Sequence, residues 1–190
     1  MNSLTQAKTL GGVGSILLLL FFVPFVGFIL TFVGLILILI AIKYISDALK
    51  DKAIFENILI STILIIVGTV LFIILFFFTL FGTFFPIPFP ASSPGFWMDV
   101  IPRFLINMLV MLLILLATYL VGTIFLRRGY NIIASKLNVK LFSTTALLYL
   151  IGAALTIVMV GFIVIFVALI LQTIAFFSIP EKLPEAQSSR

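Results

Sequence analysis

Four uncharged stretches, each long enough to span a bilayer as a helix, constrain this chain more than any other feature of its sequence. They cover residues 9–42, 57–81, 104–126 and 141–179. A helix rises about 1.5 Å per residue, so roughly 20 apolar residues cross a hydrocarbon core about 30 Å thick. The composition agrees, because 64% of the residues are hydrophobic and 9% are charged, whereas soluble domains carry about 25% charged residues. We therefore predict an all-α integral membrane protein.

The first and last stretches are too long for single crossings. They hold 34 and 39 residues, and even the shorter one would form a helix of about 51 Å. Pro24 and Gly27 lie near the middle of the first stretch and Gly161 near the middle of the last, and such residues interrupt helices. The sequence therefore predicts one membrane domain over residues 1–178 and a polar cytoplasmic tail over 179–190. Its six short transmembrane helices form three hairpins, at about residues 9–26, 27–42, 57–81, 104–126, 141–160 and 161–178.

The basic residues support this threading, because Lys and Arg are retained on the cytoplasmic side of short loops. With six helices, ten of the 11 basic residues lie on one face and only Arg103 lies opposite. With each long stretch as one crossing, the division is seven against four. We therefore expect both termini to be cytoplasmic. A hairpin that enters and leaves by the same face gives the same division whether it crosses or ends within the bilayer, so both arrangements remain open for the first and third hairpins.

The first and third hairpins are similar in sequence. At an offset of 134 positions, residues 26–41 and 160–175 are identical at 11 of 16 sites, which predicts a parallel repeat. Small residues recur on one helix face of each copy, and such residues let membrane helices approach closely. We expect the two faces to pack on each other about a pseudo-twofold axis. Their small residues are Gly27 and Gly34 in the first copy and Gly161 and Ala168 in the second.

Two polar connectors are expected to lie on the cytoplasmic surface. Residues 43–57 carry three basic and three acidic side chains, which predicts a neutral helix at the interface. Residues 127–141 carry four basic side chains and no acid. They predict a helix that binds anionic lipid headgroups or serves only to fix the topology. The basic residues of this second connector are Arg127, Arg128, Lys136 and Lys140.

Polar side chains inside the apolar stretches are few, and none is charged. Gln172 is the deepest amide and replaces Ile38 of the first copy, while Thr118 and Tyr119 form a second polar cluster. Such residues line a polar path or, more commonly, form hydrogen bonds between helices. On the opposite face, residues 82–97 interleave Pro with Phe and Trp. This pattern is typical of an aromatic anchor at headgroup depth, with a cover for a pore or an apolar ligand as the alternative.

The residue inventory excludes most catalytic and metal-binding chemistry. The chain has no Cys and no His, so we expect no disulfide, thiol nucleophile, Cys/His zinc site or His-based triad. Its six acids lie outside the four apolar stretches, and its basic residues form no continuous face for nucleic acid. We therefore expect no catalytic, cofactor-binding or metal-binding residue, no cofactor and no nucleic-acid partner.

Three segments carry a family resemblance: AKTLGGVG at residues 7–14, VGLILILIAIKYISD at 33–47 and IFEN at 54–57. They resemble an archaeal family of multi-pass membrane proteins known as domain of unknown function 996. The resemblance implies an archaeal plasma-membrane protein, and it supplies no activity, ligand or catalytic residue.

Taken together, these features favour a small non-enzymatic membrane protein. It would be a structural or accessory component that associates with itself or with a membrane partner through small-residue helix faces. Its two short hairpins would alternatively act as wedges in the cytoplasmic leaflet. The rival hypothesis is a passive channel or uncoupled transporter for a small or apolar solute, with a path near Gln172, Tyr119 and the aromatic loop.

The threading makes a prediction that labelling tests. Because the chain has no native Cys, Ser92→Cys and Ser135→Cys each provide a single reactive thiol. We expect an impermeant maleimide to label these two variants from opposite sides of the membrane. Labelling of both variants from the same side would refute the threading.

Overall fold

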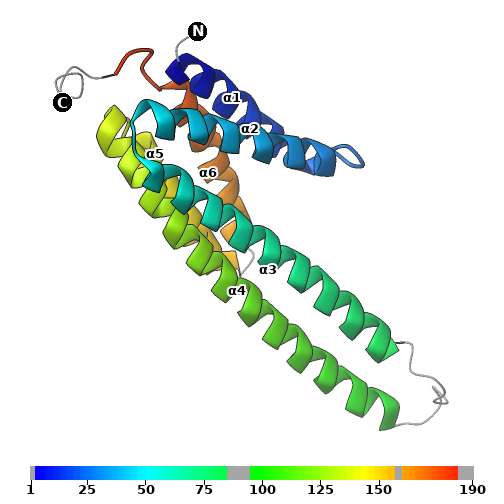
Figure 1. The fold of residues 1–190 in the computed structure, drawn as a ribbon. Coiled ribbons are helices and arrows are strands. Elements are labelled where there is room, and N and C mark those ends of the chain that lie inside the picture. The colour runs from blue at the N-terminus through cyan, green and yellow to red at the C-terminus, as the bar shows by residue number, and fades with distance from the viewer. Residues whose placement is uncertain (1–2, 85–94, 157–159, 184–190) are drawn as a thin grey trace.

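The structure, a computed structural model, describes residues 3–84, 95–156 and 160–183. Those residues form six α-helices and one 3₁₀ turn and contain no strand (Figure 1), which confirms the all-helical prediction. Five of these helices are long and apolar enough to cross a membrane, whereas α5 is shorter. The elements are α1 (Ser3–Leu19), η1 (Leu20–Phe22), α2 (Gly27–Ala48), α3 (Lys52–Phe84), α4 (Gly95–Leu137), α5 (Leu141–Leu155) and α6 (Val160–Phe177).

The described helices associate as three neighbouring pairs. α1 packs along α2, α3 along α4, and α5 along α6, while α4 also contacts α5 and α1 contacts α6. Figure 1 shows the start of α1, the end of α6 and the α2–α3 and α4–α5 turns gathered at one end of the molecule, which we call the base. The α3–α4 pair extends from the base far beyond the other helices (Figure 1). We call α3–α4 the long arm, and α1–α2 and α5–α6 the short arms.

The base contains the main hydrophobic core of the described residues. Tyr130 of α4, Phe142 of α5 and Phe176 of α6 are fully buried there. Their rings pack edge to face, with centroids 5.3 Å apart for Tyr130 and Phe142 and 5.2 Å apart for Phe142 and Phe176. Ile42 and Ile45 of α2 belong to the same cluster. Because aromatic pairs in this geometry add about 0.5–1.5 kcal/mol beyond burial, the cluster fixes where the three arms originate.

The first short arm turns at the position that the sequence indicates. Residues 23–26 separate η1 from α2, and Phe25 has a φ of 64°. The N–H groups of Val26 and Gly27 donate to the carbonyls of Pro24 and Val23 at 2.7 and 2.8 Å. In the second short arm, α5 ends and α6 begins on either side of residues that lie outside the described part of the chain.

The prediction of a separate interfacial helix over residues 43–57 is wrong. α2 and α3 extend into this segment from both sides and leave only residues 49–51 between them. Lys50 turns the chain with a φ of 50°, and the Asp51 N–H donates to the Ser46 carbonyl at 3.0 Å. This is the long hydrogen bond of a Schellman motif, which ends a helix by reversing the chain sharply.

The prediction of a separate surface helix over residues 127–141 is also wrong, because α4 continues without interruption to Leu137. Asn138 ends α4 with a φ of 55°, and the Val139 N–H donates to the Ala134 carbonyl at 3.1 Å. The apolar face of this segment packs into the core of the base instead of lying on lipid. Helical periodicity identified the apolar face correctly, but periodicity does not reveal whether protein or lipid covers such a face. The long arm is accordingly longer than the helices predicted at 57–81 and 104–126.

Small residues bring backbones together within each short arm. A Cβ on Gly34 of α2 would lie 2.6 Å from the carbonyl oxygen of Gly14 of α1, and a Cβ on Gly161 of α6 would collide with the carbonyl of Gly152 of α5. α6 packs on α5 and α1 among the described helices. The prediction that the two repeat faces pack on each other is therefore wrong, because Gly34 and Gly161 contact glycines of their own arms and α2 and α6 are not among the packed pairs of described helices. That expected contact comprised Gly27, Gly34, Gly161 and Ala168.

The Gly14–Gly34 contact predicts a large effect of substitution. We expect Gly34→Leu to separate α1 from α2 and to lower the thermal stability of the detergent-solubilised chain, because overpacking costs about 1–3 kcal/mol. Gly82→Leu is the matched control, since a Cβ on Gly82 meets nothing within 4 Å, and its melting temperature should match that of the native chain. Equal melting temperatures for the two variants would contradict the close helix contact.

Candidate functional site

A buried hydrogen-bond network centred on Gln172 joins four helices. Gln172 of α6 is 3% exposed. Its Oε1 accepts hydrogen bonds from the hydroxyls of Tyr130 on α4, at 3.0 Å, and Tyr149 on α5, at 2.8 Å. Its Nε2 donates to the hydroxyl of Ser15 on α1 at 3.0 Å, and Ser15 donates in turn to the Gly11 carbonyl at 2.8 Å. The amide therefore links the long arm and both short arms.

The sequence identified Gln172 but not its partners. An amide carries both an acceptor and a donor, so it can accept from two tyrosines and donate to a serine at the same time. The sequence similarity between the first and third hairpins would have indicated two of these partners, Ser15 and Tyr149. At the offset of 134 positions Ser15 aligns with Tyr149, just as Ile38 aligns with Gln172. The polar residues at these aligned positions come together in space.

A cavity of about 270 Å³ lies beside this network, and residues from all six helices line it. Gln172 and Tyr119, which the sequence placed on a possible polar path, both line this cavity. The Tyr119 hydroxyl lies 3.0 Å from the hydroxyl of Thr69. Thr118 does not line the cavity, since its hydroxyl bonds within α4 and its side chain packs against Gly68 of α3. The structure thus joins two of the three predicted path residues and separates the third.

Ser61 of α3 differs from the other hydroxyl residues of the cavity wall. It is 1% exposed and lines the cavity. Its Oγ has no hydrogen-bond partner within the described ranges. By contrast, Thr62 and Thr123 of the same wall donate to carbonyls of their own helices. Because buried hydroxyls are nearly always paired, Ser61 is the polar group of this wall that needs an explanation.

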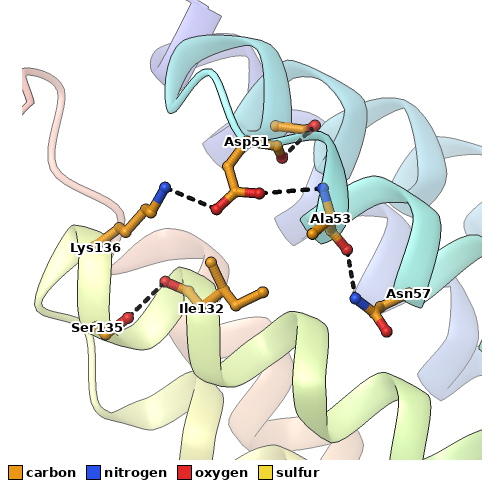
Figure 2. Close-up of polar contacts among 7 residues, drawn as sticks. Asp51, Ala53, Asn57, Ile132, Ser135 and Lys136 are labelled. Carbon is orange, nitrogen blue, oxygen red and sulfur yellow. Dashed lines mark hydrogen bonds and ion pairs between the residues drawn. The ribbon is translucent and has the colours of Figure 1, made fainter.

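Lys136, which was expected to face lipid headgroups, instead binds a carboxylate of the protein. Figure 2 shows its Nζ against Asp51, at 2.7 Å from Oδ2. The other carboxylate oxygen accepts from the Ala53 N–H at 3.1 Å (Figure 2) and so caps the start of α3. The hydrogen bond from Lys136, reinforced by its charge, holds the pKa of Asp51 below its usual value. The lipid-facing expectation for Lys136 is therefore wrong, and this residue ties the α2–α3 turn to the end of α4.

The other three basic residues of this segment are exposed at the base. Arg127, Arg128 and Lys140 all lie on the surface, and the Arg128 guanidinium lies over the ring of Phe125 at 5.5 Å from its centroid. No group of three or more His, Cys, Asp or Glu side chains comes together among the described residues. The exposed guanidinium and ammonium groups are the side chains of this segment that remain open to an anionic surface.

Comparison with known proteins agrees with the resemblance seen in the sequence. The model of a family described as "Protein of unknown function (DUF996)" matches residues 30–170. The uncharacterised protein MJ1644 of Methanocaldococcus jannaschii is 32% identical to this chain over 180 residues, which cover 95% of both sequences. No solved structure gives a match.

The Gln172 network predicts a measurable coupling. We expect Gln172→Leu to lower the free energy of unfolding in detergent by about 1–3 kcal/mol, because two tyrosine hydroxyls lose their acceptor. Tyr149→Phe should cost less, since it removes one donor and leaves the other bonds in place. In a double-mutant cycle the second substitution should have a smaller effect in the Gln172→Leu background. Strict additivity would show that the two side chains do not interact.

Proposed function

The chain belongs to the DUF996 family of proteins of unknown function, and we propose that it is a non-enzymatic membrane protein that shapes its bilayer. In this proposal it is a multi-pass plasma-membrane protein with both termini cytoplasmic. The long arm crosses the membrane, while the two short arms enter and leave the cytoplasmic leaflet as wedges. The observation that carries the proposal is the difference in reach between the arms.

The apolar reach of each arm follows from the position of its charged residues. In α2, the distance along the helix from Lys43 to Gly27 is about 24 Å, and α5 and α6 are about 22 and 27 Å long in total. In the long arm, the stretch from Glu56 to Phe84 measures about 42 Å. The hydrocarbon core is about 30 Å thick. By length and composition α1, α2 and α6 are candidate spans, but α2 from Lys43 and α6 in total both measure less than this core, so in this proposal the short arms end within the bilayer that the long arm crosses. The α1–α2 arm also diverges from the direction of α3 in Figure 1.

The residues of the first turn support the proposal that the α1–α2 arm ends within the hydrocarbon core. Residues 19–28 contain no polar side chain, and Phe25 and Phe28 are 99% and 81% exposed. In water such exposure is unfavourable, whereas in lipid it is favourable. Backbone groups in lipid must be satisfied within the protein. The N–H groups of Val23, Val26 and Gly27 bond inside the turn, Pro24 has none, and Phe25 alone among residues 23–27 contributes an N–H without a backbone acceptor in the described chain.

The two short arms have matching glycine contacts at the starts of α2 and α6 and lie side by side, which supports a parallel repeat. A Cβ on Gly27 would meet the backbone of Phe21, and one on Gly161 would meet the backbone of Leu155. Phe21 and Leu155 are themselves 134 positions apart. The ring of Phe22 at the first turn packs edge to face on Phe166 of α6, with centroids 5.7 Å apart. Together the arms would widen one leaflet, while the exposed basic residues of the base hold anionic headgroups.

Accessibility of single cysteines tests this arrangement. We expect Phe25→Cys to resist an impermeant maleimide from either side, because the turn lies in hydrocarbon. Ser135→Cys should react from the cytoplasmic side and Met98→Cys from the opposite side, since Met98 is 80% exposed near the far end of the long arm. Reaction of Phe25→Cys from the side of Met98→Cys would show that the short arm crosses, which contradicts the wedge.

The shaping activity itself is tested with large vesicles that contain anionic lipid. Reconstituted native chain should narrow the vesicles into tubules, and Phe25→Asn, which makes the turn polar, should reduce tubulation severalfold. Gly82→Leu again serves as the control. Vesicles that stay spherical at high protein density would refute the proposal.

A further inference from the structure

We propose that the cavity between the three arms is a binding site for an uncharged, apolar molecule that carries one hydrogen-bond-accepting oxygen, such as a ketone, ester or ether. This proposal rests on the cavity and on Ser61, and it holds whether or not the short arms act as wedges. Its ligand would be dissolved in the membrane and would bind from the hydrocarbon.

The lining of the cavity defines the main chemistry of the ligand. Aliphatic side chains from α1, α2, α3 and α6 dominate the wall, and among the described residues that line it none is charged. A charged ligand in such a site would lose its hydration without gaining a counter-charge, which is strongly unfavourable. The site therefore selects against ions, phosphates and carboxylates. The aliphatic residues include Leu18, Leu35, Ile38, Ile65, Ile165 and Leu169.

Ser61 supplies a hydroxyl donor in this apolar wall. Ser61 belongs to the cavity wall, and its buried hydroxyl has no acceptor among the described residues. The tyrosine hydroxyls of Tyr130 and Tyr149 already donate to Gln172, and the Tyr119 hydroxyl is paired with that of Thr69. Ser61 is thus the described hydroxyl of the wall whose proton remains available. A ligand oxygen placed beside it would satisfy a group that otherwise loses a hydrogen bond on burial.

Size and access agree with a membrane-soluble ligand. A volume of about 270 Å³ accommodates a small ring system or a short length of hydrocarbon chain, since an apolar cavity of about 150 Å³ holds benzene. The wall includes Ile66 of α3, which is 41% exposed, so the cavity reaches the lipid-facing surface there. Ser61 lies five residues beyond Glu56, about 8 Å along α3, which places the polar group at a shallow depth below the base.

Photolabelling with benzophenone tests the proposal directly. Benzophenone is an uncharged apolar ketone that inserts into nearby C–H bonds under ultraviolet light. With the full chain in vesicles of neutral lipid, we expect labelling to concentrate on cavity residues such as Ile65 and Leu169. An excess of an unreactive ketone should compete, whereas diphenylmethane, which lacks the oxygen, should compete at least about fivefold less well, as the loss of one hydrogen bond predicts.

Two variants separate binding from folding. Ser61→Ala should reduce cavity labelling about fivefold, yet leave the melting temperature of the ligand-free chain equal or higher, because the substitution removes an unpaired buried hydroxyl. Leu35→Trp should block labelling by filling the cavity, while Leu37→Trp, two residues along α2 and absent from the cavity wall, should not. Labelling that is spread over the lipid-facing surface, or that is unchanged in Ser61→Ala and Leu35→Trp, would overturn the proposal.

Two competitors distinguish the source of the ligand. Protection by a ketone with a 16-carbon chain, without protection by acetophenone, would identify a lipid chain as the occupant. The opposite result would identify a compact solute. Either outcome supports the proposed chemistry, and failure of both ketones to protect would contradict it.

Discussion

The side chain of Gln172 is the interaction on which the relative placement of the three arms depends. Lipid supplies no hydrophobic drive for helices to associate, because its chains are as apolar as the helices themselves. Outside the base, the arms must be held by backbone packing and by interhelical hydrogen bonds. The Gln172 amide accepts hydrogen bonds from α4 of the long arm and α5 of its own arm, and it donates one to α1 of the other short arm. One residue thereby links all three arms, and the cavity lies beside this link.

Within each pair the physics is different. The Gly14–Gly34 and Gly152–Gly161 contacts bring backbone against backbone, which gives each short arm a rigid form without polar side chains. At the base, aromatic packing and the ion pair between Lys136 and Asp51 secure the turns between pairs. The structure therefore combines closely packed arms, a well-packed base and a buried polar link between the arms.

Much of the fold was predictable because it follows from the lengths of the uncharged stretches and from the residues that interrupt them. The uncharged stretches indicated the helices, and Pro24 with Gly27 indicated the first turn. The connectors were not predictable, because the apolar face around Leu137 has the same pattern whether lipid or protein covers it. The partners of small residues were also hidden, since Gly34 fits a neighbour in its own arm as well as one in the other. Of the site, Gln172 and Tyr119 were found as rare polar residues. Ser61 was missed because a serine in an apolar helix ordinarily bonds to its own backbone.

The difference between Ile38 and Gln172 at matched positions has a consequence for assembly. Two arms of similar sequence are liable to exchange places when the chain folds, since either could dock beside the long arm. In the exchanged arrangement Gln172 would keep its bond from Tyr149 of its own arm but lose the bond from Tyr130 of the long arm, and Tyr130 would meet Ile38 instead. The amide thus distinguishes the copies, and its bonds to Tyr130 and Ser15 favour the order of the arms that the structure shows. A repeat with isoleucine at both positions would be degenerate, and the chain would have two nearly equivalent ways to assemble.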